Sequence, residues 1–219
     1  MKSFPMAADP FSRSPTGTEL SRRQILVAGA AAVVATSPAL AQNGRGDWYI
    51  GIIPDDPFDI EVVDILRVPP EFRRQTVRFD GPEPPGTIVV DKERRHLFWI
   101  GPDRQAVRYG IAIGRAGTSL VGQSTVGRKA VWPRWTPTES MRSRDPSLPQ
   151  SMPGGPRNPL GARALYLFEN GRDTIYRIHG TNQPWTIGKA ASSGCVRMLN
   201  QHIFELYASV PVGTRVVVR

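Results

Sequence analysis

Short apolar runs punctuate the chain from about residue 75 onward. They are rich in valine, isoleucine and aromatic residues and are bounded by glycine, proline or charged turns, which is the pattern of β-strands. The runs 87–90 and 96–100 flank a charged turn and predict a hairpin. The expected strands span residues 75–79, 87–90, 96–100, 106–113, 129–132, 164–167, 174–178 and 214–218. Many short strands predict a sandwich or barrel.

One segment instead has the period of a helix. It begins at Asn200, a favourable N-cap residue, and it ends at Pro211 and Gly213. Its apolar face consists of Ile203, Leu206, Tyr207 and Val210, spaced as one helical face requires. We therefore predict a mostly-β fold with one or two short helices.

Two proline-rich stretches interrupt the strand pattern. Residues 42–85 have little periodicity, so we expect an N-terminal arm or linker that precedes a folded domain at 86–219. Residues 133–160 are irregular and carry seven prolines. A loop of that length in a compact domain is usually functional or disordered, and a lid over a site is the functional interpretation.

The N-terminal segment has the parts of an export signal. Residues 21–41 comprise an adjacent pair of arginines, an apolar run (25–35) and a small-x-small site that ends at Ala41. The paired arginines are typical of a twin-arginine signal, and the apolar run is shorter than the about 20 residues that span a bilayer. We expect residues 1–41 to be a signal peptide cleaved after Ala41, leaving a periplasmic protein without a stable membrane span. An uncleaved anchor is the alternative.

Charge and cysteine content narrow the function classes. The formal net charge is +9, and residues 42–219 retain +7 from 24 basic and 17 acidic residues. A basic surface suits an anionic polymer, although charge can also serve solubility alone. The export signal argues against nucleic acid as the partner. One cysteine and three histidines exclude an internal disulfide and make a metal site unexpected.

The candidate chemistry lies in the segments 178–181 and 192–198. His179 ends an expected strand, and Cys195 follows a Ser-Ser-Gly turn. A neighbouring imidazole can activate a thiol as nucleophile. Gly194 lets the backbone aim the N–H groups of Gly194 and Cys195 at one point, as an oxyanion hole requires. Arg197 could add positive charge near the thiolate or hold a substrate carboxylate with two hydrogen bonds. A buried structural cysteine is the alternative.

These segments resemble the signature of the L,D-transpeptidase (YkuD-type) family, His-Gly-x-x followed by Ser-x-Gly-Cys-[Ile/Val]-Arg. The matching positions are His179, Gly180, Ser192, Gly194, Cys195, Val196 and Arg197. The likeness extends over about residues 84–219. It departs at Ser124–Gly127, where many members carry Thr-Pro-x-Gly.

The resemblance implies a β-sandwich-like catalytic domain that needs no cofactor. Cys195 would attack the carbonyl of the position-3 diamino acid of a peptidoglycan tetrapeptide stem and release D-Ala. An amine would resolve the thioester: a second stem, giving a 3-3 crosslink, a lipoprotein lysine or a free D-amino acid. His179 would take the thiol proton, and the Gly180 carbonyl would orient its ring. The expected substrate-binding residues are Arg197, Ser192, Ser193, Thr181, Trp135 and Tyr109.

Two other functions use the same residues or surface. An L,D-carboxypeptidase would pass the acyl group to water, and a non-catalytic peptidoglycan-binding module would rely on the basic surface and the proline-rich arm. His96 and His202 are expected at the surface.

Overall fold

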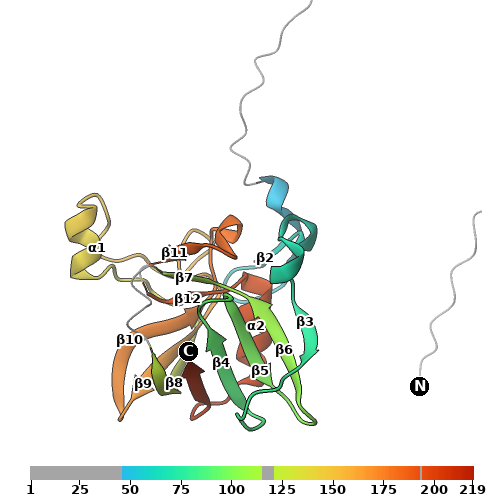
Figure 1. Ribbon diagram of the computed structural model, residues 1–219. Coiled ribbons are helices and arrows are strands. Elements are labelled where there is room, and N and C mark those ends of the chain that lie inside the picture. Colours follow the sequence, from blue (N-terminus) through green and yellow to red (C-terminus); the bar gives the residue numbers. More distant parts are fainter. Residues whose placement is uncertain (1–45, 115–120, 193) are drawn as a thin grey trace, which may run out of the picture. The chain divides into compact units, whose positions relative to one another are not determined.

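Among residues 46–114, 121–192 and 194–219, which the computed structural model describes, eleven strands form one sheet (Figure 1). In sheet order they are β11 (Ala190–Ser192), β7 (Ala112–Gly114), β12 (Val196–Arg197), β10 (Arg172–His179), β9 (Arg163–Glu169), β8 (Gly122–Val131), β13 (Arg215–Val218), β4 (Thr87–Asp91), β5 (His96–Ile100), β6 (Gln105–Gly110) and β3 (Gln75–Arg78). The pairs β11–β7, β10–β12 and β13–β4 are parallel, and the other neighbours are antiparallel.

The expected strands are present, with two corrections. Residues 106–113, predicted as one strand, form β6 and β7 with a break at Ile111. The run 129–132 is only the end of β8, whose earlier residues are mostly exposed and therefore lack an apolar run. The mostly-β prediction is confirmed.

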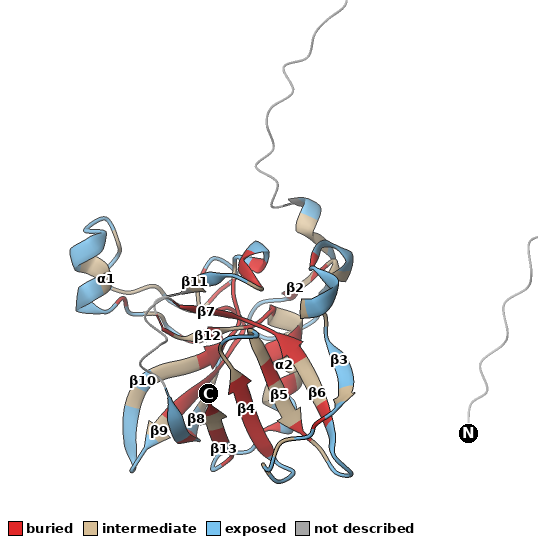
Figure 2. Cartoon of the chain, viewed as in Figure 1, coloured by how far each residue is buried: buried red, intermediate tan, exposed pale blue. Residues whose placement is uncertain are grey.

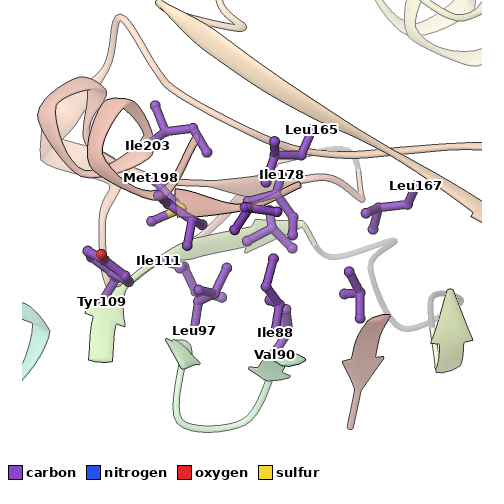
Figure 3. Packing of buried hydrophobic residues seen from close by; sticks show 14 of the residues in the cluster. Ile88, Val90, Leu97, Tyr109, Ile111, Leu165, Leu167, Ile178, Met198 and Ile203 are labelled. Carbon is purple, nitrogen blue, oxygen red and sulfur yellow. The ribbon is translucent and has the colours of Figure 1, made fainter. Parts of the chain in front are cut away.

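The principal core lies inside the curved sheet. Apolar side chains of β4 and β5 share one buried cluster with those of β10 and β12, although these strands come from opposite halves of the sheet order. The helix α2 (Asn200–Ser209) adds Ile203, which Figure 3 labels, and Leu206 to this cluster, and Val210 follows the helix in it. Figure 2 shows the buried positions on the strands that surround α2. The two halves of the sheet therefore pack like the layers of a sandwich.

Two predictions about α2 are wrong. Its N-cap is Leu199, and Asn200 is its first helical residue, because the Asn200 side chain accepts hydrogen bonds elsewhere. His202 is only 5% exposed and lies 5.5 Å from the Tyr109 ring, measured between ring centroids. Burial lowers the pKa of His202 to about 4. His96 is half-buried, and its Nε2 lies 2.9 Å from the Glu71 carbonyl oxygen.

The segment before β4 is more structured than an extended arm. The strand expected at 75–79 is β3, and a second sheet pairs β1 (Tyr49–Ile53) with β2 (Ile60–Val63). Val63 exchanges two hydrogen bonds with the Gln201 side chain on α2, at 3.1 and 2.9 Å. The segment also contains the 3₁₀ helices Gly46–Trp48, Ile65–Arg67 and Pro70–Phe72. Residues 46–78 therefore pack against the large sheet and α2.

A buried ion pair fastens this segment to β9. Arg163 donates to both Asp55 carboxylate oxygens, at 2.7 and 2.5 Å, and Trp132 Nε1 donates to Asp55 Oδ2 at 2.8 Å. The Arg163 and Asp55 side chains are 6% and 12% exposed. The hydrogen bond from Arg163 holds the pKa of Asp55 below its usual value.

Replacing Asp55 by alanine is expected to lower the free energy of unfolding by about 3–5 kcal/mol, because it leaves the Arg163 charge buried and unpaired. Urea denaturation of both proteins measures the difference. The matched control is Asp80→Ala, which removes the exposed Arg78–Asp80 pair (side chains 68% and 75% exposed) and should change stability by less than about 1 kcal/mol. Equal effects of the two substitutions would contradict the prediction.

The expected signal peptide at 1–41 lies outside the described residues. Within the described part of the chain, no helix combines the length and apolarity that a bilayer span requires.

Candidate active site

Two parallel strands bring the two signature segments side by side. In the register of β10 and β12, Ile178 lies opposite Val196, and His179 lies opposite Arg197. Ile178 and Val196 are fully buried in the core. Because side chains alternate along a strand, His179 and Arg197 point to the other face. Cys195 immediately precedes β12, two residues before Arg197.

His179 is held by the carbonyl that follows it. Its Nδ1 lies 2.6 Å from the Gly180 carbonyl oxygen, which can only accept a hydrogen bond, so Nδ1 carries the ring proton. The side chain is 3% exposed. Burial, together with the Arg197 charge, lowers the pKa of His179 to about 3, against the opposing effect of the Gly180 and Leu160 carbonyls. At neutral pH the imidazole is therefore uncharged and able to accept a proton.

Asn200 fixes the loop that carries the Gly180 carbonyl. Its Oδ1 accepts hydrogen bonds from the backbone N–H groups of Thr181, at 3.0 Å, and Ala162, at 3.1 Å. A Cβ atom on Gly161 or Gly180 would overlap this oxygen. The Asn200 side chain thus joins the start of α2 to the loop after His179 and to the segment entering β9. The sequence pattern predicts only a capping role for Asn200.

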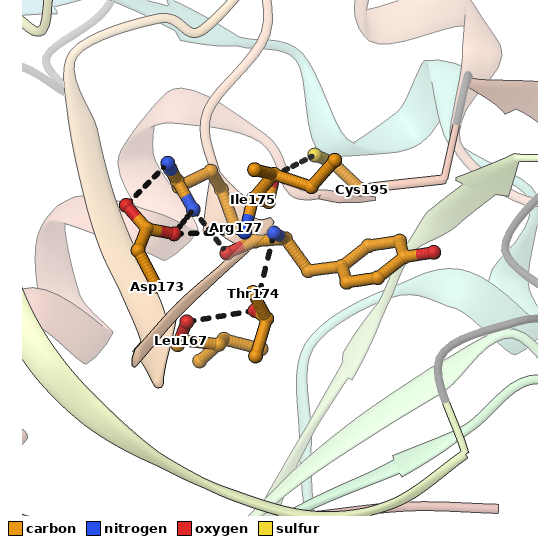
Figure 4. Close-up of polar contacts among 7 residues, drawn as sticks. Leu167, Asp173, Thr174, Ile175, Arg177 and Cys195 are labelled. Carbon is orange, nitrogen blue, oxygen red and sulfur yellow. Dashed lines mark hydrogen bonds and ion pairs between the residues drawn. The ribbon is translucent and has the colours of Figure 1, made fainter. Parts of the chain in front are cut away.

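Cys195 follows a glycine in an unusual conformation. Gly194 has φ 128°, in the region that favours glycine. Cys195 is half-buried, and its Sγ lies 4.0 Å from the Ile175 carbonyl oxygen (Figure 4). Burial raises the pKa of the Cys195 thiol, although the Arg177 backbone N–H and the charges of Arg177 and Arg197 act in the opposite direction. The thiol is therefore protonated at neutral pH and needs a base.

The strand opposite Cys195 is bulged. The pairing of β10 with β9 shifts between Asp173 and Arg177, and Ile175 adopts φ 60°, which is rare for a β-branched residue. The bulge directs the Ile175 carbonyl at the thiol and leaves the Ile175 side chain 67% exposed.

Arg197 and Thr181 are fastened from the same loop. Arg197 Nη1 donates to Gln183 Oε1 at 3.3 Å, and Thr181 Oγ1 accepts from the Gln183 backbone N–H at 3.0 Å. The Arg197 Nε is buried and has no hydrogen-bond partner among the described residues. This atom has no access to solvent, so a substrate contact of Arg197 has to come from the rest of its guanidinium.

The remaining predicted binding residues are more dispersed. Trp135 is half-buried in the segment 133–160 and exchanges two backbone hydrogen bonds with Met152, at 2.9 and 2.8 Å. Tyr109 is 1% exposed within the principal core, so the structure does not bring its side chain to the site face. Ser192 ends β11 opposite Gly114, and Ser193 lies outside the described residues.

The segment 133–160 is ordered by its own contacts. It contains the helix α1 (Glu139–Arg144). Asn158 Nδ2 donates to the carbonyl oxygens of Pro133, Met152 and Pro153, at 3.0, 3.2 and 2.9 Å. The buried Asn158 amide thus ties both ends of the predicted lid together.

In the described part of the chain, no group of three His, Cys, Asp or Glu side chains could hold a metal ion.

Comparison with known proteins gives consistent matches. A family model described as the L,D-transpeptidase catalytic domain (YkuD) matches residues 85–218. The probable L,D-transpeptidase ErfK/SrfK of Escherichia coli (strain K12) is 43% identical over 136 residues, which are 59% of this chain and 42% of that protein. The putative L,D-transpeptidase YqjB of Bacillus subtilis (strain 168) is 48% identical over 134 residues, 60% of this chain and 69% of that protein.

Among solved structures, a probable carnitine operon oxidoreductase caia from Brucella melitensis has 48% sequence identity and a TM-score of 0.48, and the match covers 71% of this chain and 99% of that chain. The match with ErfK/SrfK covers 42% of that protein, so the present chain spans less than half of its length.

Proposed function

Because the chain belongs to the L,D-transpeptidase (YkuD) catalytic-domain family, we propose that it is an exported acyltransferase that acts on peptidoglycan stem peptides through Cys195. The observation that carries the proposal is the register of β10 and β12, which sets His179 opposite Arg197, two residues after Cys195. The base lies at the end of β10 and the nucleophile immediately precedes the neighbouring strand β12, so the sheet positions both.

The first half-reaction forms a thioester. The neutral His179 imidazole takes the Cys195 proton as the sulfur attacks the carbonyl carbon of the position-3 diamino acid. The bond from that carbon to the D-Ala nitrogen then breaks, and the imidazolium returns its proton to the departing amine. The Gly180 carbonyl keeps the ring in the tautomer that can accept from sulfur.

The second half-reaction transfers the acyl group to an amine. The amine nitrogen attacks the thioester carbonyl, His179 takes the excess proton, and the thiol of Cys195 is regenerated. Backbone N–H groups of Gly194 and Cys195 would stabilise the oxyanion in both steps. Arg197 would bind a substrate carboxylate, and Thr181, Ser192, Ser193 and Trp135 would supply further substrate contacts.

The acceptor and the compartment follow from the same proposal. A second stem peptide would give a 3-3 crosslink, and a lipoprotein lysine would give an attached protein. The twin-arginine-type segment at 1–41 would direct the folded protein to the periplasm, with residues 42–85 preceding a catalytic domain at 86–219. Water as acceptor would make the enzyme an L,D-carboxypeptidase.

Incubation with a purified disaccharide-tetrapeptide, followed by mass spectrometry, tests the proposal. We expect a crosslinked dimer that lacks one D-Ala. Tripeptide alone would identify a carboxypeptidase. Binding of the tetrapeptide without any conversion, with or without an added amine acceptor, would contradict catalysis and favour a peptidoglycan-binding module.

A further inference from the structure

Three side chains form a row across neighbouring strands and lead to Cys195. Arg128 on β8 and Arg177 on β10 are both direct register partners of Tyr166 on β9. The guanidinium carbons of Arg128 and Arg177 lie 3.4 and 4.2 Å from the centre of the Tyr166 ring. The row ends near Cys195, whose Sγ lies 4.0 Å from the carbonyl oxygen of Ile175, two residues before Arg177 on β10.

The row lies on the outer face of the sheet. The alternating residues Leu165, Leu167 and Ile178 are fully buried in the core, so Tyr166 and Arg177 face the opposite way. Arg128 is exposed, whereas Tyr166 is covered by the two arginines. A molecule that approaches Cys195 along this face therefore meets Arg128.

The two arginines differ in their charge partners. Arg177 donates to both carboxylate oxygens of Asp173, at 2.6 and 2.9 Å, as Figure 4 shows. Arg128 has no carboxylate partner among the described residues. The stack on Tyr166 restrains its guanidinium and leaves the edges open, which is the geometry for accepting a carboxylate with two parallel hydrogen bonds.

From this arrangement we infer that Arg128, held on Tyr166, is a subsite for a side carboxylate of the donor stem peptide. Tyr166 lies two strand spacings from β12, about 10 Å, and an extended peptide covers about 10 Å in three residues. A tetrapeptide has two residues before the scissile one, and they cover about 7 Å when extended. The side chain that carries the carboxylate and the Arg128 guanidinium span the remainder while the scissile carbonyl lies at Cys195. Arg177, whose guanidinium is paired with the Asp173 carboxylate, supports the Tyr166 ring from the side of Cys195. The inference rests on the proposed function for the identity of the ligand.

The test measures peptide binding without turnover. In a Cys195→Ala background, calorimetry compares the free-acid tetrapeptide with a form whose side carboxylates are amides and whose terminal carboxylate is retained. Arg128→Gln should weaken binding of the free acid about tenfold, because it removes a charge-assisted bidentate contact, and should leave binding of the amide unchanged. Arg128→Lys should restore part of the loss.

The control Arg67→Gln removes one exposed positive charge on the 3₁₀ helix Ile65–Arg67 and should leave both affinities unchanged. Equal weakening by Arg67→Gln, or an Arg128→Gln effect that is the same for acid and amide, would overturn the subsite. Failure of the wild-type enzyme to convert the tetrapeptide would overturn the proposed function instead, because the binding comparison does not depend on turnover.

Discussion

Replacing Cys195 by alanine is expected to abolish D-Ala release and crosslink formation, with a loss of at least about 10⁴-fold. The sulfur is the atom that forms the thioester, and no second cysteine exists in the chain to replace it. The oxyanion donors and the substrate contacts remain in the variant but have no covalent intermediate to stabilise. Mass spectrometry of the products and of the intact protein measures both the turnover and the acyl-enzyme.

The variant should keep its fold and its ligand. Cys195 is half-buried and immediately precedes the two-residue strand β12, so loss of the sulfur should leave the thermal midpoint nearly unchanged. Tetrapeptide affinity should also persist, which separates loss of chemistry from loss of binding. Crosslinked product at more than a hundredth of the wild-type rate, from protein free of wild-type contamination, would show that Cys195 is not the nucleophile.

The strands and α2 could be predicted because each is encoded by the pattern of apolar and polar residues within its own short segment. Residues 87–90 and 96–100 alternate or run apolar between turn residues, and the helical face from Ile203 to Val210 follows one period. The signature around Cys195 also depends on local backbone needs, since Gly194 has a φ that disfavours other residues. The chemistry of the site could therefore be proposed before its geometry was known.

Contacts between distant segments could not be predicted in this way. Residues 46–78 have weak periodicity because their order comes from partners far along the chain, such as Gln201 for Val63 and Arg163 for Asp55. Asn200 is of a residue type that often caps a helix, but its side chain accepts hydrogen bonds from the backbone N–H groups of Ala162 and Thr181. Tyr109 has an aromatic side chain suited to a pocket, yet its strand register directs it into the core.

The row from Arg128 to Cys195 could not be predicted from the sequence for the same reason. Its members are separated by 38, 11 and 18 positions in the sequence, and only the pairing of four strands brings them into line. Strand pairing depends on the whole fold, so no single run of residues carries it.

Replacing His179 by glutamine is expected to lower the rate of Cys195 acylation by about 10²–10⁴-fold at neutral pH. The pKa of His179 is about 3 and that of Cys195 is raised, so the resting pair is a neutral imidazole and a neutral thiol. Acylation then requires proton transfer to His179 as sulfur attacks. Glutamine can hydrogen bond at this position but cannot take the proton.

The same pKa shifts fix the pH dependence with a definite sign. Since His179 loses its proton well below pH 5 and Cys195 keeps its proton above the ordinary range of a cysteine, neither group titrates between about pH 5 and 8. The wild-type acylation rate should therefore be nearly constant over that interval. Alkylation of the enzyme by iodoacetamide, which reports thiolate alone, should instead rise about tenfold per pH unit through neutrality.

Rapid-quench mass spectrometry of acylation and alkylation from pH 5 to 10 distinguishes this mechanism from a preformed ion pair. In the His179→Gln enzyme, acylation should become proportional to hydroxide while alkylation at pH 10 stays close to wild type. His96→Gln, which changes a half-buried histidine on β5, should alter neither rate. An alkylation rate that levels off below pH 7 in the wild type would mean that a thiolate–imidazolium pair already exists, and that His179 acts by charge before it acts as a base.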